Sequence, residues 1–127
     1  MKFPFNPKAG LVIVETKLFG PSGDFVVKLA LDTGATCSLV NWHILSMLGY
    51  DPGNEKEQIE ITTGSGIEYA PLLKLKKVQA LGKSRNDFAF VCHTLPPSAT
   101  VDGLLGLDFL RKRRLSLDFR KGALELG

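Results

Sequence analysis

Short apolar stretches separated by turn signals run along most of the chain. Two such stretches, residues 11–19 and 25–31, are rich in Val, Ile and Leu, and the Gly-Pro-Ser-Gly sequence between them is typical of a turn. In the second stretch the side chains on one face are all apolar: Phe25, Val27, Leu29 and Leu31. The pattern therefore predicts a β-hairpin whose second strand ends at Asp32.

Further strands are predicted along the rest of the chain. They are residues 58–62, 67–78, 88–92, 115–119 and 123–126. A glycine-rich tip at 63–66 joins the first two, and Pro71 leaves open whether 67–78 forms one strand or two. Many short strands with a turn signal about every ten residues predict a mostly β fold, either a small barrel or a sandwich.

Helical signals are few and short. Asn41 is suited to cap a helix at 42–48, which Gly49 can end. A second short helix is predicted at 108–113, after an apolar segment and a glycine. Residues 95–98 contain two prolines and predict a rigid loop.

Length and composition fit one globular domain. The 127 residues are 44% hydrophobic and 23% charged, which excludes a disordered chain and a large two-lobed enzyme. We expect an irregular N-terminal arm at 1–10, which holds two prolines, and a single domain at 11–127.

Charge and cysteine content predict a soluble, cytoplasmic protein. No apolar run reaches the roughly 18 residues that a membrane span needs, and the N-terminus lacks the apolar run of a signal peptide. Because no such run is present, we expect no membrane partner. Cys37 and Cys92 are too few for a disulfide framework, so we expect two reduced thiols. The net charge of +3 is too small to argue for nucleic-acid binding.

The most informative stretch for chemistry begins at Asp32. An apolar strand that runs directly into an aspartate leaves a carboxylate at the edge of a core, where burial disfavours the charged form unless hydrogen bonds compensate. Gly34 allows a sharp turn that aims backbone N–H groups at this carboxylate, and Thr33 adds a hydroxyl beside it. Taken alone, the segment is also typical of an aspartate that simply starts a tight turn after a strand.

Three motifs, taken in order, resemble one family. The Leu-Asp-Thr-Gly-Ala sequence at 31–35 resembles the active-site loop of the retropepsin-like aspartic proteases. The Gly-Leu-Leu-Gly sequence at 103–106 resembles the apolar pair and glycine that pack beneath that loop and lead into a short helix. The Thr-Gly-Ser-Gly sequence at 63–66 stands where the family has its flap hairpin. The resemblance covers residues 11–126 and implies a small closed antiparallel β-barrel of the acid-protease (retropepsin) type with one or two short helices.

The resemblance also implies roles for individual residues in an aspartic endopeptidase. Asp32 would be the catalytic aspartate, and Thr33 would hydrogen-bond across a two-fold axis to the loop of a second copy. The residues that support the active-site loop would be Thr33, Gly34, Ala35, Leu104, Leu105 and Gly106. The flap that closes over a polypeptide substrate would consist of Thr63, Gly64, Ser65, Gly66 and Ile67. No cofactor and no metal ion is implied.

Peptide hydrolysis of this kind needs two carboxyl groups. One, ionised, takes a proton from the attacking water, while the other, protonated, polarises the scissile carbonyl. Two carboxylates about 3 Å apart cannot both ionise, so they share one proton. The chain has no second Asp-Thr-Gly or Asp-Ser-Gly, and the other aspartates considered lie in different contexts: Asp87, Asp102, Asp108 and Asp118. We therefore expect a homodimer in which each copy contributes Asp32, and an inactive monomer.

Two further details follow from the resemblance. Pepsin-like members of the superfamily carry Ser or Thr at the position of Ala35, and its hydroxyl stabilises the ionised carboxylate. Because alanine lacks that hydroxyl, we expect a mildly acidic optimum rather than a strongly acidic one. Residues 123–126 resemble the segment that viral enzymes interleave at their dimer interface, and whether they do so here is left open.

Two other functions stay open at this point. A catalytically inactive protein on the same fold could bind an extended peptide by strand addition or serve as a dimerisation module. A nucleic-acid-binding barrel could use the basic run at 111–114, but no aromatic residue interleaves with that run, so we expect a solvated helix end and no nucleic-acid partner. His43 and the Cys92-His93 pair lack the spacing of a metal site, so none is expected.

Overall fold

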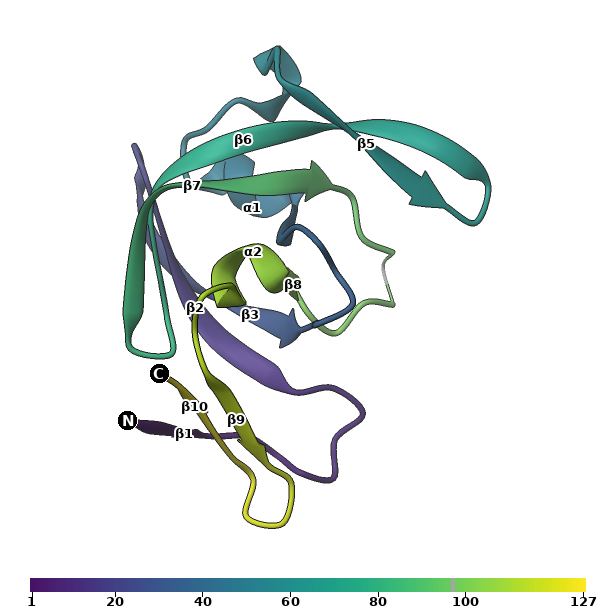
Figure 1. Cartoon of the computed structure of the whole chain (residues 1–127). Coiled ribbons are helices and arrows are strands. Elements are labelled where there is room, and N and C mark those ends of the chain that lie inside the picture. Colours follow the sequence, from purple (N-terminus) through teal and green to yellow (C-terminus); the bar gives the residue numbers. More distant parts are fainter. Residues whose placement is uncertain (97) are drawn as a thin grey trace.

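Figure 1 shows the computed structural model of the chain, which describes residues 1–96 and 98–127. The first half holds β1 (Lys2–Pro4), β2 (Ile13–Gly20), β3 (Gly23–Leu31), β4 (Leu39–Asn41), α1 (Trp42–Met47), the 3-10 turn η1 (Pro52–Asn54) and β5 (Gln58–Thr63). The second half holds β6 (Gly66–Ala80), β7 (Lys83–His93), β8 (Gly103–Leu105), α2 (Leu107–Leu110), β9 (Leu115–Asp118) and β10 (Ala123–Leu126). The rigid loop predicted at 95–98 includes Pro97, which lies outside the described residues.

A closed barrel forms the body of the molecule. The main sheet has the order β2-β3-β8-β4-β7-β6-β5, and an additional pairing of β2 with β6 closes six of these strands into a ring within the described chain. The fifth strand, β5, stays outside the ring and pairs only with the first part of β6 in the described sheet. The predicted closed, mostly antiparallel β-barrel is therefore confirmed, and the sandwich alternative is excluded.

The hairpin of β2 and β3 forms where the alternating pattern predicts it. The two strands pair antiparallel from Ile13 opposite Ala30 to Gly20 opposite Gly23. The side chains of Val27 and Leu29 point into the core, whereas Phe25 at the start of the strand stays 40% exposed. The hairpin thus delivers Asp32 to the point where the buried part of β3 ends.

The strand β6 is one continuous strand and is slightly longer than the predicted range of 67–78. It runs through Pro71 without a break, because the proline lies opposite Gln58 and the next N–H, that of Leu72, bonds the Glu57 carbonyl at 2.9 Å. The first part of β6 therefore pairs with β5 as a hairpin, and the rest pairs with β7 and β2 as a wall of the barrel.

The strand β7 begins at Lys83, five residues before the predicted start. The turn that precedes it places Leu81 and Gly82 at φ values of 53° and 75°, the left-handed pair that two-residue hairpins use. Leu81 is buried, with 5% exposure, so core packing holds a turn for which the sequence offers no Asn-Gly signal.

The capped helix is confirmed and the second helix is shorter than predicted. Asn41 accepts a hydrogen bond from the His43 N–H at the start of α1. The helix predicted at 108–113 is wrong in its extent, since α2 is a single turn whose chain leaves helical geometry at Arg111. The exposed basic run at 111–114 consequently follows this turn and does not form its last residues.

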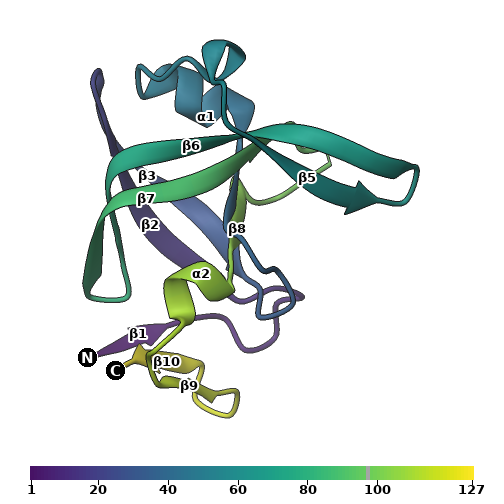
Figure 2. The same ribbon diagram turned by 45° about the horizontal axis from the view of Figure 1, so that its top comes forward.

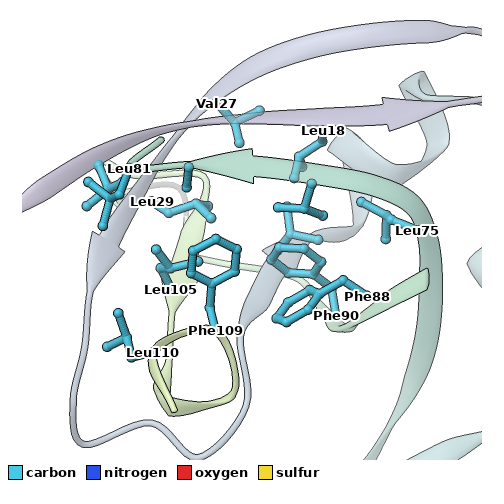
Figure 3. Packing of buried hydrophobic residues seen from close by; sticks show 14 of the residues in the cluster. Leu18, Val27, Leu29, Leu75, Leu81, Phe88, Phe90, Leu105, Phe109 and Leu110 are labelled. Carbon is cyan, nitrogen blue, oxygen red and sulfur yellow. The ribbon is translucent and has the colours of Figure 1, made fainter. Parts of the chain in front are cut away.

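The core fills the barrel and is sealed by α2 (Figure 3). Leu18, Leu29 and Leu75 line the inside from three strands and are fully buried. Phe109 from α2 packs edge-on against Phe88 at 5.7 Å between ring centroids, and Phe88 packs the same way against Phe90 at 5.3 Å. Such aromatic pairs contribute beyond their buried area, so α2 is held against the barrel floor.

A second, three-stranded sheet has the order β1-β10-β9. The expectation of an irregular arm is wrong for Lys2–Pro4, because this segment pairs with β10 and places the two termini side by side (Figure 1). The N-terminal ammonium also contacts Glu125 at 3.0 Å, which lowers the pKa of that carboxyl group. Both edges of β10 are thus bonded within one chain.

The strand β8 is inserted between two neighbours of opposite direction. It runs parallel to β3 and antiparallel to β4, and a side chain at Gly103 would approach the Leu39 carbonyl oxygen to 2.0 Å. Only glycine allows β4 to lie this close.

We predict that Gly103→Ala destabilises the protein because its methyl group has no space. The expected loss is at the upper end of the roughly 1–3 kcal/mol that overpacking costs, read from thermal or denaturant unfolding. Gly10→Ala is the matched control, since no atom lies within 4 Å of the added methyl group, and it should leave stability nearly unchanged. Equal stability of the two variants would contradict the packing described for β8.

Candidate active site

Asp32 lies directly after β3 and is held by backbone hydrogen bonds. Its N–H donates to the Leu105 carbonyl at 2.9 Å, which continues the pairing of β3 with β8. Its carboxylate atom Oδ1 accepts the Gly34 N–H at 2.9 Å, and its carbonyl accepts the Ala35 N–H at 3.2 Å. The chain therefore turns back on the half-buried Asp32 and orients its carboxylate at the start of the loop.

The Gly-Leu-Leu-Gly segment supports this loop from below. The Leu107 N–H donates to the Ala35 carbonyl at 2.8 Å, and a side chain at Gly106 would lie 2.7 Å from the same oxygen. Leu105 and Gly106 are buried and Leu104 is half-buried. The structure thus brings together the two segments that the sequence analysis paired, residues 32–35 and residues 104–106.

A buried polar contact that the sequence analysis missed locks the two segments together. The Ser38 hydroxyl donates to Asp108 Oδ1 at 2.6 Å and accepts the Gly106 N–H at 2.9 Å. The Ser38 N–H donates to the other oxygen, Oδ2, at 2.8 Å. Because Ser38 is fully buried, the loss of any of these hydrogen bonds would lower the free energy of unfolding. The available signal was a serine and an aspartate placed just after the two predicted motifs.

The outer side of the loop is open to solvent. Thr33 and Gly34 are exposed, whereas Asp32 is half-buried. In the single chain the predicted flap is the tip of the β5–β6 hairpin, which projects beyond the barrel in Figure 2. Gly64, Ser65, Gly66 and Ile67 are exposed there, and the side chain of Thr63 lies outside the described part of the chain.

Comparison with known families decides the assignment of this loop and barrel. The family described as "gag-polyprotein putative aspartyl protease" matches residues 22–112, which include the Asp32 loop, the β5–β6 hairpin and the segment beneath the loop. The chain belongs to this aspartyl protease family.

Solved structures agree with the aspartyl protease fold. The crystal structure of a retropepsin-like aspartic protease from Rickettsia conorii has a TM-score of 0.73 to this chain, at 22% sequence identity. The match covers 99% of this chain and 88% of that one. No protein of curated function matches the sequence. At this level of identity the structural likeness shows the shared fold, and the roles of single residues stay predictions.

An aspartyl protease loop of this kind offers one carboxyl group per chain. That group either accepts a proton or donates one, so a single loop serves as base or as acid but not as both in one step.

Among the described residues, no group of three or more His, Cys, Asp or Glu side chains gathers in a way that could bind a metal ion. No described helix is long and apolar enough to span a membrane.

Neither thiol is set up as a nucleophile near the aspartyl protease loop. Burial raises the pKa of Cys92 to about 11, so this thiol stays protonated at neutral pH. Burial, and then the nearby negative charge of Asp108, raise the pKa of Cys37. Both are free cysteines, as the composition led us to expect.

Ser38→Ala should weaken both the fold and the loop. The substitution leaves the buried Gly106 N–H without its acceptor and Asp108 Oδ1 with the Phe109 N–H alone, and an unpaired buried group costs about 1–3 kcal/mol. Unfolding by denaturant measures the loss. Ser84→Ala, at an exposed position on β7, is the control and should stay within about 0.5 kcal/mol of wild type. If the two alanine variants unfold alike, the proposed support of the loop is wrong.

Proposed function

We propose that this protein is an aspartic endopeptidase that acts as a homodimer and hydrolyses peptide bonds with water activated between two Asp32 carboxyl groups. The observation that carries the proposal is the Asp32 carboxylate, oriented by the Gly34 N–H at the open end of a protease-family loop. The substrate class proposed is an extended polypeptide, and no cofactor takes part.

In the proposed mechanism the two Asp32 side chains share one proton. The ionised carboxylate takes a proton from the water as it attacks the scissile carbonyl carbon, and the protonated one donates to the carbonyl oxygen. When the tetrahedral intermediate collapses, the carboxyl group that took the proton from water donates it to the leaving nitrogen, and the other takes its proton back from the oxygen. Because water and not Asp32 is the nucleophile, no covalent enzyme intermediate forms. In each copy the Gly34 N–H stabilises the negative charge on Oδ1 while that Asp32 is ionised.

Dimerisation is supported by what the single chain leaves open. Thr33, exposed beside Asp32, is available to a second copy of the loop. Because β10 is bonded on both edges within one chain, it cannot interleave with a partner in this conformation. We therefore propose that strand contacts between copies use the outer edges of the small sheet, at β1 and β9.

The flap supports an extended polypeptide as the substrate. Ile67 and Tyr69 lie on the same face of β6 and are 62% and 70% exposed. Exposed apolar side chains on a hairpin that projects beyond the barrel are suited to contact with a bound chain. The same features would let an inactive member of the family bind a peptide without cleaving it.

We predict that Asp32→Asn abolishes peptide cleavage while stability and self-association stay at wild-type levels. The amide keeps the shape of the side chain but cannot take a proton from water, so the rate should fall by at least about 10³-fold. A peptide-library digest with and without a pepstatin-type inhibitor measures it. Asp87→Asn changes an exposed aspartate on β7 and is the control. Cleavage by purified Asp32→Asn would contradict the mechanism. A wild-type protein that binds peptides tightly but does not cleave them would support the inactive module.

Mixing wild type with Asp32→Asn tests whether each copy contributes half of the site. If both Asp32 residues of a dimer are needed, an equal mixture allowed to exchange subunits should show about one quarter of the activity of the same total amount of wild type. A chain that acted alone would keep about half.

A further inference from the structure

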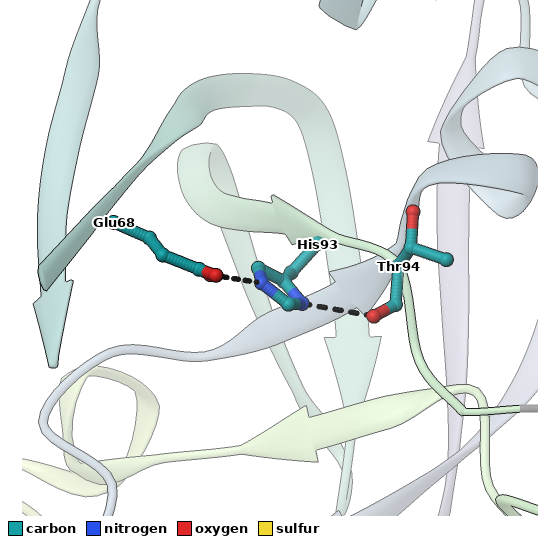
Figure 4. A network of polar contacts seen from close by, with 3 residues as sticks. All are labelled: Glu68, His93 and Thr94. Carbon is teal, nitrogen blue, oxygen red and sulfur yellow. Dashed lines mark hydrogen bonds and ion pairs between the residues drawn. The ribbon is translucent and has the colours of Figure 1, made fainter. Parts of the chain in front are cut away.

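His93 lies between the barrel and the flap and is in contact with both (Figure 4). It is the last residue of β7, and its ring atom Nδ1 lies 2.9 Å from the Thr94 carbonyl oxygen. The other ring nitrogen, Nε2, lies 3.2 Å from Oε2 of Glu68. Glu68 belongs to the projecting part of β6, two residues beyond the flap tip at Gly66.

Both atoms that face the ring are hydrogen-bond acceptors. A carbonyl oxygen and a carboxylate oxygen each need a donor, but a neutral imidazole carries a single N–H. A neutral ring that donates from Nδ1 would therefore turn the lone pair of Nε2 towards the negative carboxylate, and one that donates from Nε2 would turn the lone pair of Nδ1 towards the Thr94 carbonyl. Only the imidazolium form, with both nitrogens protonated, satisfies the two contacts together.

We propose that His93 is a positioning residue for the flap: when protonated it holds Glu68, and with it the β5–β6 hairpin, against the barrel. In either neutral tautomer, deprotonation removes one of the two hydrogen bonds and the positive charge that attracts the Glu68 carboxylate, so the hold on the hairpin weakens. The attraction to Glu68 is then strongest at acidic pH and weakens as the ring loses its proton. The link to catalysis rests on the proposed function, whereas the link to flap position does not.

The other groups around the ring do not replace Glu68. On the β4 side His93 is paired with Asn41, an uncharged amide that caps α1. From α1 the titratable group is His43, whose backbone N–H donates to Asn41. From the segment before β8 it is Asp102, whose carboxylate is bonded to the Lys28 N–H at 2.9 Å. Among the described residues, Glu68 is the charged side chain in hydrogen-bond contact with the ring.

Solvent limits the size of the effect. The side chains of His93 and Glu68 are 34% and 48% exposed, so water and salt screen the pair. Exposed ion pairs of this kind change equilibria by roughly two- to fivefold. We therefore expect the flap to shift between two populations and not to lock fully in either.

The first test follows the flap directly by NMR on the full-length Asp32→Asn protein, between pH 5 and pH 8. We expect the backbone amides of Gly64 and Gly66 to shift with the same midpoint as the His93 ring nitrogens. In Glu68→Ala this coupled shift should disappear. His43→Gln removes the other histidine of the chain and should leave it intact. A coupled shift that survives in Glu68→Ala, or that is lost with His43→Gln, overturns the proposal.

The second test separates flap position from general damage to the fold. His93→Lys keeps a positive charge at all pH values tested, so its flap amides should resemble the low-pH wild type at pH 8, whereas His93→Gln should resemble the high-pH form. In the active protein, KM should rise by roughly two- to fivefold between pH 5.5 and pH 7.5 in the wild type but not in His93→Lys. Flap amides that report no difference between the Lys and Gln variants contradict the proposal even if cleavage is never detected.

Discussion

The hydrogen bonds that join the end of β3 to β8 determine where the candidate site can form. The Asp32 N–H reaches the Leu105 carbonyl, and the loop then turns back so that the Gly34 N–H meets the carboxylate. A carboxylate at the edge of an apolar core is tolerated only when such donors face it. The barrel, the Gly106 contact and the one-turn helix α2 all serve to keep these two segments in register.

Much of this arrangement could be predicted from local signals. The alternation of apolar residues predicted the β2–β3 hairpin, Asn41 marked the start of α1, and two of the three motifs indicated the segments that meet at the loop. These features depend on neighbours in sequence or on a family pattern. The order of strands in the ring and its closure through β2 and β6 depend on distant pairings, which no local pattern contains.

The features that were missed share a physical origin in long-range contact. Lys2–Pro4 becomes a strand only because β10 offers it an edge, and Leu81 adopts a left-handed turn only because its side chain is buried. The Ser38–Asp108 contact spans 70 positions of the chain. No local sequence pattern marks this serine or this aspartate, and only the fold brings them into contact.

One chain supplies a complete loop but half of the proposed chemistry. For the flap we propose that the contact between Glu68 and His93 sets its position and that its target is a substrate bound between two copies. Two protonation events therefore carry the proposals. One is the proton shared between the two Asp32 carboxyl groups, and the other is the protonation of the His93 imidazole that holds the hairpin.

The most direct test of the central claim is the separation of the two Asp32 carboxyl groups in a crystal structure of the homodimer bound to a peptide-like inhibitor. The account predicts that their nearest oxygens lie about 3 Å apart across a two-fold axis, with an inhibitor hydroxyl or a water between them. A dimer that binds the inhibitor while its Asp32 side chains lie far apart would contradict it.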